Sequence, residues 1–150
     1  MPEPWATRLI VDGQGQLFVD ERDLWPGGDF VTAHIIVRTP FLRDHPERVR
    51  AWLEAHVDVT RWAIAHPDEA KAILNDEIER LTGARLSDEV LTMAWERLRP
   101  TWDPLSSSLV SSADAAYRAG FLKEQPDLAG IYDLALLNAV LEELGLPRVQ

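Results

Sequence analysis

The chain has 150 residues, 46% of them hydrophobic, which is enough for one ordinary domain with an apolar core. Six tryptophans and a charged fraction of 27% exclude an intrinsically disordered chain. The formal net charge of -10 repels phosphate backbones and anionic lipid, so we expect no nucleic-acid partner. Without cysteine the chain has no disulfide, thiolate metal site or cysteine nucleophile.

No run of about 18 apolar residues occurs, so we expect no membrane insertion by this chain. Met1 is followed at once by Pro2, Glu3 and Pro4, which lack the basic start and apolar run of an export signal. If the parent protein is exported, we expect its signal upstream of this chain.

The first 38 residues have the pattern of strands and turns. Glycines punctuate them, and the run Pro26-Gly27-Gly28 is typical of a tight turn. Gln16–Val19 is a short candidate strand. Phe30–Val37 is the strongest candidate, because its nearly continuous apolar run is rich in β-branched residues. Such a run is typical of a strand that helices cover on both faces.

From Pro40 onward the apolar residues recur at helical spacing. Proline and following acids begin two helices, at Pro46 and Pro67, and Ser87 is a suitable N-cap for a third. The serines at 106–108 look like another N-cap region, and Thr101–Pro104 predicts a brief strand or an extended turn. The pattern predicts five helices, which begin near residues 46, 67, 88, 109 and 133 and end near residues 63, 82, 98, 119 and 144.

These helices have little sheet to cover. A buried strand at Phe30–Val37 needs a neighbour on each side, and the chain offers few. The helical stripes therefore fit a sheet whose other strands are missing. The chain shows no internal repeat and no low-complexity tract.

Four groups of residues occur in a characteristic order along nearly the whole chain. They are Pro2–Leu9, then Asp23–Leu42 with His45–Val49, then Asp103–Leu109 with Ala113–Leu122, and finally Asp127–Leu134. Together they resemble the solute-binding proteins of ABC importers, in the aliphatic sulfonate, taurine and nitrate (NMT1-like) family. Their order and spacing, rather than any single motif, make the resemblance specific.

The resemblance implies an α/β fold, namely a helix-rich fragment of a type II periplasmic-binding-protein fold with about four strands and about five helices. Residues 1–28 would end the second lobe, residues 29–38 would form a hinge-crossing strand, and residues 39–150 would be a helical return that covers the first lobe. The chain would be a single compact unit and a carboxy-terminal fragment, with the amino-terminal lobe upstream. The full-length parent would be periplasmic, or extracellular and membrane-anchored.

Glu3 and Trp5 are the first pair of candidate ligand-binding residues, because the resemblance implies that their segment ends a strand facing the ligand cleft. Trp5 would stack on an alkyl or aromatic ligand body, and Glu3 would accept a hydrogen bond. The alternative is a core tryptophan beside a surface acid.

Thr32 and His34 are the second pair of candidate ligand-binding residues. Residues two apart on a strand point to one face, so this hydroxyl and imidazole would together hold an oxyanion such as a sulfonate. The simpler alternative is a core histidine whose hydrogen bonds are satisfied.

No pattern indicates an enzyme. The histidines lack the helical spacing of a metal site, and no G-x-S-x-G motif surrounds a serine. The G-x-G at Gly13 and Gly15 lacks the third glycine of a dinucleotide loop. We therefore expect no catalytic residue, no metal and no cofactor.

The resemblance implies the substrate-binding component of an ABC importer for small organic anions such as aliphatic sulfonates, acting by capture and hinge closure. Expected partners are the anion, an ABC permease in the full-length parent, and a second copy paired through an exposed sheet edge. One alternative is a stand-alone helical interaction module without a transport role. A further alternative is a thiamine-precursor enzyme on the same fold.

Overall fold

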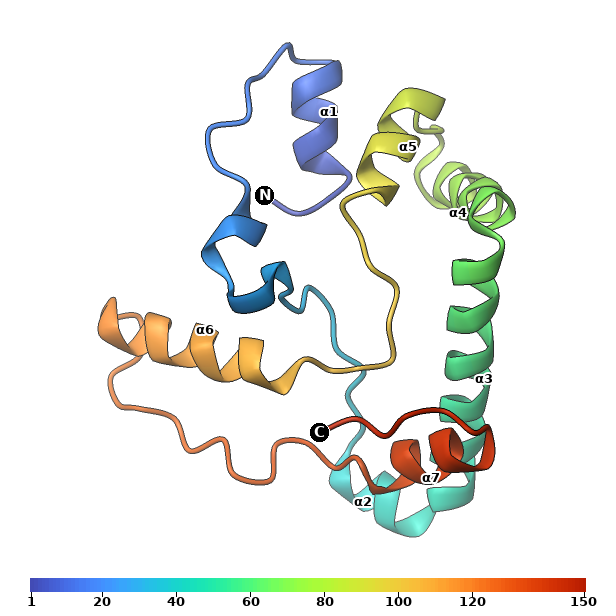
Figure 1. The fold of residues 1–150 in the computed structure, drawn as a ribbon, viewed down its shortest axis with the longest axis vertical. Coiled ribbons are helices and arrows are strands. Elements are labelled where there is room, and N and C mark those ends of the chain that lie inside the picture. The colour runs from blue at the N-terminus through green and yellow to red at the C-terminus, as the bar shows by residue number, and fades with distance from the viewer. The chain divides into compact units, whose positions relative to one another are not determined.

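The computed structural model describes residues 1–25 and 27–150, and none of them forms a β-strand. Seven α-helices lie within these residues (Figure 1). They are α1 (Trp5–Val11), α2 (Thr39–Asp44), α3 (Pro46–Ala65), α4 (Pro67–Thr82), α5 (Asp88–Trp95), α6 (Ser106–Arg118) and α7 (Ala135–Glu143). Between α1 and α2 lie two short 3-10 helices, η1 (Glu21–Leu24) and η2 (Pro26–Gly28).

The predicted α/β fold is therefore wrong. Gln16–Val19 and Phe30–Val37 are irregular segments. A strand is stabilised by a ladder of hydrogen bonds to a neighbour, so β-branched residues alone do not make one. Helices do not cover the apolar run either, because Ile35 and Ile36 are 52% and 90% exposed. Thr101–Pro104 is likewise no strand, and Asp103 accepts the backbone N–H of Leu105 across a turn at 2.8 Å.

The capping residues correctly predicted where α3, α4 and α5 begin. Helices α3 and α4 begin at Pro46 and Pro67, and α4 ends at Gly83, whose φ of 79° is left-handed. The Ser87 hydroxyl accepts the backbone N–H of Val90 at the start of α5. The expected N-cap serines before α6 are instead its first residues. The first helix, α1, replaces the strand end expected at its position, and it packs against α5 (Figure 1).

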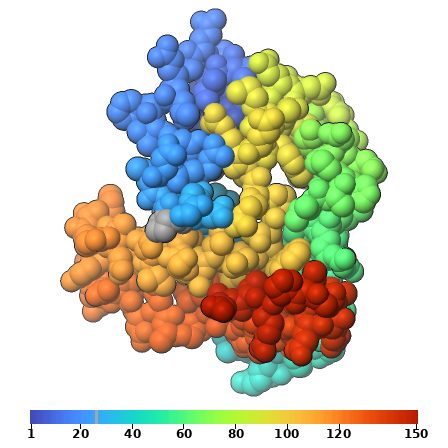
Figure 2. All heavy atoms as spheres, viewed as in Figure 1, coloured from blue at the N-terminus to red at the C-terminus, as the bar shows by residue number. Residues whose placement is uncertain are grey.

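The described chain divides into two compact units. Unit 1 comprises residues 1–19 and 58–101, and unit 2 comprises residues 20–57 and 102–150, so α3 contributes to both. The expected division into residues 1–28, 29–38 and 39–150 stays a prediction. Figure 2 shows α7 and the tail that follows it (red) as one packed body. The core of unit 2 consists of Val57, Leu137, Val140 and Leu141, with Leu53, Trp102, Leu134, Leu146 and Val149 packed against it.

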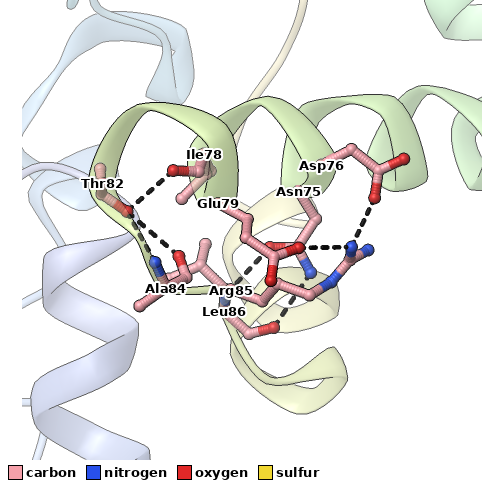
Figure 3. A network of polar contacts seen from close by, with 8 residues as sticks. All are labelled: Asn75, Asp76, Ile78, Glu79, Thr82, Ala84, Arg85 and Leu86. Carbon is pink, nitrogen blue, oxygen red and sulfur yellow. Dashed lines mark hydrogen bonds and ion pairs between the residues drawn. The ribbon is translucent and has the colours of Figure 1, made fainter.

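Each unit contains a buried asparagine that holds the chain where it continues beyond a helix. On α4, Asn75 is 2% exposed, accepts the N–H of Leu86 at 2.9 Å and donates to the carbonyl of Leu86 at 3.0 Å (Figure 3). On α7, Asn138 makes the same two bonds with Val149, at 2.8 and 3.1 Å. We call these two pairs the asparagine clamps. Each satisfies one backbone donor and one backbone acceptor.

The asparagine clamps also share sequence. Residues 72–86 read AILNDEIERLTGARL and residues 135–149 read ALLNAVLEELGLPRV, which align without a gap. A glycine with positive φ follows each helix, Gly83 at 79° and Gly145 at 67°, although the two stand one position apart in this alignment. In the first copy Arg85 also pairs with Asp76 and Glu79 of α4 (Figure 3).

Replacing Asn75 or Asn138 by alanine leaves a half-buried backbone N–H and C=O without their side-chain partner. We expect each substitution to lower the free energy of unfolding by about 1–3 kcal/mol, measured by urea denaturation. Glu142→Ala, on the exposed face of α7, is the matched control. An Asn138→Ala protein as stable as Glu142→Ala would show that the clamp contributes nothing.

Candidate functional site

Glu3 lies at the amino-terminal end of α1, in unit 1, with a side chain only 8% exposed. Its Oε2 accepts the backbone N–H of Thr7 at 3.1 Å, and its Oε1 lies 3.5 Å from Nη1 of Arg97. The first N–H groups of a helix lack partners within the helix, and a carboxylate also suits the positive end of the helix dipole. Glu3 therefore caps α1, and it is not the surface acid of the alternative interpretation.

Trp5 begins α1 and is 54% exposed, so it is not a core tryptophan. The guanidinium of Arg8 lies over its ring at 5.2 Å from the centroid, and Arg8 Nε lies 3.3 Å from Oδ2 of Asp12. These three side chains line an open hollow of about 490 Å³, together with Met1, Leu9 and Gly13. The hollow can hold a flat or alkyl group against the indole.

Thr32 and His34 lie in unit 2, on the irregular segment that was expected to be a strand. Thr32 is exposed at a bend. Alternate side chains point to one face only in a strand, and this segment is not a strand. The two side chains are therefore no longer expected to share a face. The four candidate residues thus divide between the two units, Glu3 and Trp5 in one, Thr32 and His34 in the other.

His34 is exposed and makes contacts with two segments far along the chain. Its Nε2 lies 2.8 Å from the hydroxyl of Tyr132 and 3.1 Å from the carbonyl oxygen of Pro104. The two rings are tilted by 48° with centroids 5.5 Å apart. His34 is therefore not a core histidine but part of a polar cluster, which we call the His34–Tyr132 pair.

Tyr132 is the residue that the sequence did not single out. It belongs to Asp127–Leu134, one of the segments that carry the family resemblance, but a lone tyrosine in a loop gives no periodic signal. Its partner His34 is 98 residues away. Burial raises the pKa of the Tyr132 phenol above its ordinary value, because the phenolate loses hydration. The hydroxyl consequently stays protonated and can donate.

Two further properties concern metal ions and membranes. Among residues 1–25 and 27–150, no three His, Cys, Asp or Glu side chains are grouped so that they could hold a metal ion. None of the helices in this part of the chain has the length and apolar character needed to cross a membrane.

One comparison with known proteins gives a match. The sequence model of the NMT1-like family matches residues 1–75, the first half of the chain. The matched residues include all four candidates, Glu3, Trp5, Thr32 and His34, whereas Tyr132 lies outside them. No curated protein and no solved structure matches the chain.

Glu3→Ala should lower the free energy of unfolding by about 1–2 kcal/mol, because α1 loses its cap and Arg97 loses its partner. Glu3→Gln keeps an acceptor for the Thr7 N–H and should lose less. Thermal and urea unfolding measure both, with the exposed Glu124→Ala as control. If Glu3→Ala were as stable as that control, the carboxylate would not be structural.

Tyr132 should ionise above the ordinary tyrosine pKa of about 10. The chain has two tyrosines, so Tyr117→Phe leaves Tyr132 as the sole phenol, which phenolate absorbance follows during a pH titration. The unfolded chain loses this proton first, so stability should fall as pH rises from about 10 toward the folded pKa. Ionisation at or below the ordinary pKa would contradict the burial of this phenol.

Proposed function

The chain belongs to the NMT1-like family, and from this premise we propose that it binds small organic anions, such as aliphatic sulfonates, as part of the substrate-binding component of an ABC importer. The family match, which includes all four candidate residues, is the observation that carries the proposal. In this proposal the partner is an ABC permease, and the full-length parent is periplasmic, or extracellular and membrane-anchored. The ligand is captured, and none of its bonds is made or broken.

Each unit has one cluster that, taken by itself, offers contacts suited to a small organic anion. The His34–Tyr132 pair supplies the Tyr132 hydroxyl, an O–H donor that suits a sulfonate head group. The indole of Trp5 with Arg8 over its ring suits an alkyl or flat body. The net charge of -10 repels an anion at long range, so binding has to come from such local donors.

A saturable rise in melting temperature with butanesulfonate tests this proposal. A ligand that binds only the folded chain stabilises it by about 2.7 kcal/mol at about 100 times its Kd, which is about 5–10 °C for a protein of this size. Taurine and nitrate complete the screen. The 1-butanol and butylammonium controls have the same alkyl chain without the anionic group, and they should give no shift.

His34→Ala and Trp5→Ala identify which cluster is used, because each should reduce the shift only if its own cluster binds the anion. Absence of a shift with every anion, in a chain that circular dichroism shows to be folded, would contradict the proposal.

A second function, a stand-alone helical interaction module, is favoured by a different observation. Large apolar side chains lie uncovered on the described chain, among them Phe18 at 98%, Ile36 at 90% and Phe121 at 85% exposure. Where such side chains form a contiguous patch, apolar surface is typical of regions that contact another protein. With no β-strand in the described residues, the sheet edge expected to pair two copies is not present. Light scattering beside the anion screen separates the two functions, because the module predicts a complex and no anion-dependent shift.

A further inference from the structure

The His34–Tyr132 pair contains one ring nitrogen facing two oxygens. Nε2 of His34 lies within hydrogen-bond distance of the Tyr132 hydroxyl, at 2.8 Å, and of the Pro104 carbonyl, at 3.1 Å. A carbonyl oxygen only accepts, whereas a phenol both donates and accepts. The position of the proton on the imidazole therefore decides what the Tyr132 hydroxyl can do.

The contacts favour one tautomer. If Nε2 carried a lone pair, it would accept from Tyr132 but would face the lone pairs of the Pro104 carbonyl at 3.1 Å. If Nε2 carries the proton, both oxygens are acceptors and both contacts are attractive. Nε2–H is thus the form in which this geometry has no opposed lone pairs.

With Nε2 protonated, the Tyr132 hydroxyl keeps its own proton for another acceptor. Within residues 1–25 and 27–150 the structure gives this proton no acceptor besides His34. Because burial also holds the phenol in its protonated form, the hydroxyl is an oriented donor over a wide pH range.

We infer that the Tyr132 hydroxyl is the hydrogen-bond donor to a tetrahedral oxyanion, and that His34 is the residue that positions it. The inference rests on the proposed function and names, for the anion head group, a residue outside the matched half of the chain. The hydroxyl that was expected from Thr32 comes instead from Tyr132, which the fold brings to His34.

Calorimetric titration of the full chain with ethanesulfonate and with inorganic sulfate tests this inference. Tyr132→Phe removes one oxygen, and the loss of a hydrogen bond to a charged group should weaken binding of both anions about tenfold or more. Tyr117→Phe removes the other phenol of the chain and should bind as the unaltered protein does. The melting temperatures of both variants without anion show whether either fold is disturbed.

The positioning role of His34 has its own readout. His34→Gln places an amide N–H near the position of Nε2, so it should retain more affinity than His34→Ala. In the Tyr117→Phe protein, the carbon-13 signal of the Tyr132 phenol carbon should shift on addition of sulfate, and His34→Ala should reduce that shift. A Tyr132 signal that stays constant while the anion binds would overturn the inference, even if Tyr132→Phe fails to fold.

The outcomes separate this inference from the proposed function. If the unaltered chain binds ethanesulfonate and Tyr132→Phe binds it equally well, the donor assignment is wrong and anion binding stands. If sulfate binds through Tyr132 but no organic anion binds, the donor assignment stands and the sulfonate proposal fails. If neither anion binds, both fail.

Discussion

Backbone N–H and C=O groups outside the helices need partners, and the described chain has no β-sheet to supply them. At several positions buried or half-buried side chains do so instead. Besides the two asparagine clamps, the Ser108 hydroxyl accepts the N–H of Val31 at 3.1 Å and donates to the carbonyl of Leu105 at 2.8 Å. Among the side chains of the described residues, the fully buried Thr7 hydroxyl has no hydrogen-bond partner. Such a group costs about 1–3 kcal/mol.

The His34–Tyr132 pair depends on this side-chain pairing. Ser108 fixes Val31 beside the start of α6, and three residues later His34 reaches the carbonyl of Pro104, just before the same helix. Two hydrogen bonds thus hold the irregular segment against residues 104–108. Because a single exposed contact would fray easily, the 5% exposure of Ser108 matters for the geometry of His34.

Helix ends were predictable from sequence because their causes are local. Pro67, Gly83 and Ser87 act on backbone groups within one turn, so their identity alone indicates where α4 begins and ends and where α5 begins. Phe30–Val37 was not predictable in this way, because a strand depends on a partner elsewhere, and this segment has none. The prediction of a strand at the position of α1 was wrong for a related reason. The packing of this helix against α5 outweighs the strand-like composition of its sequence.

The candidate site likewise has one part that was predictable from nearby residues and one part that depends on a distant segment. Sequence indicated that a hydroxyl and an imidazole near residue 34 would suit an oxyanion, but it placed the hydroxyl on Thr32, where a strand would have put it. The fold supplies a hydroxyl from 98 residues away. That exchange changes the chemistry, because the Tyr132 phenol has a rigid ring that packs against the imidazole with centroids 5.5 Å apart. In the proposed site, a donor held by its ring would lose less freedom on binding than a threonine hydroxyl at an exposed bend, and such preorganisation would help a few local donors to offset the repulsion of a chain with net charge -10.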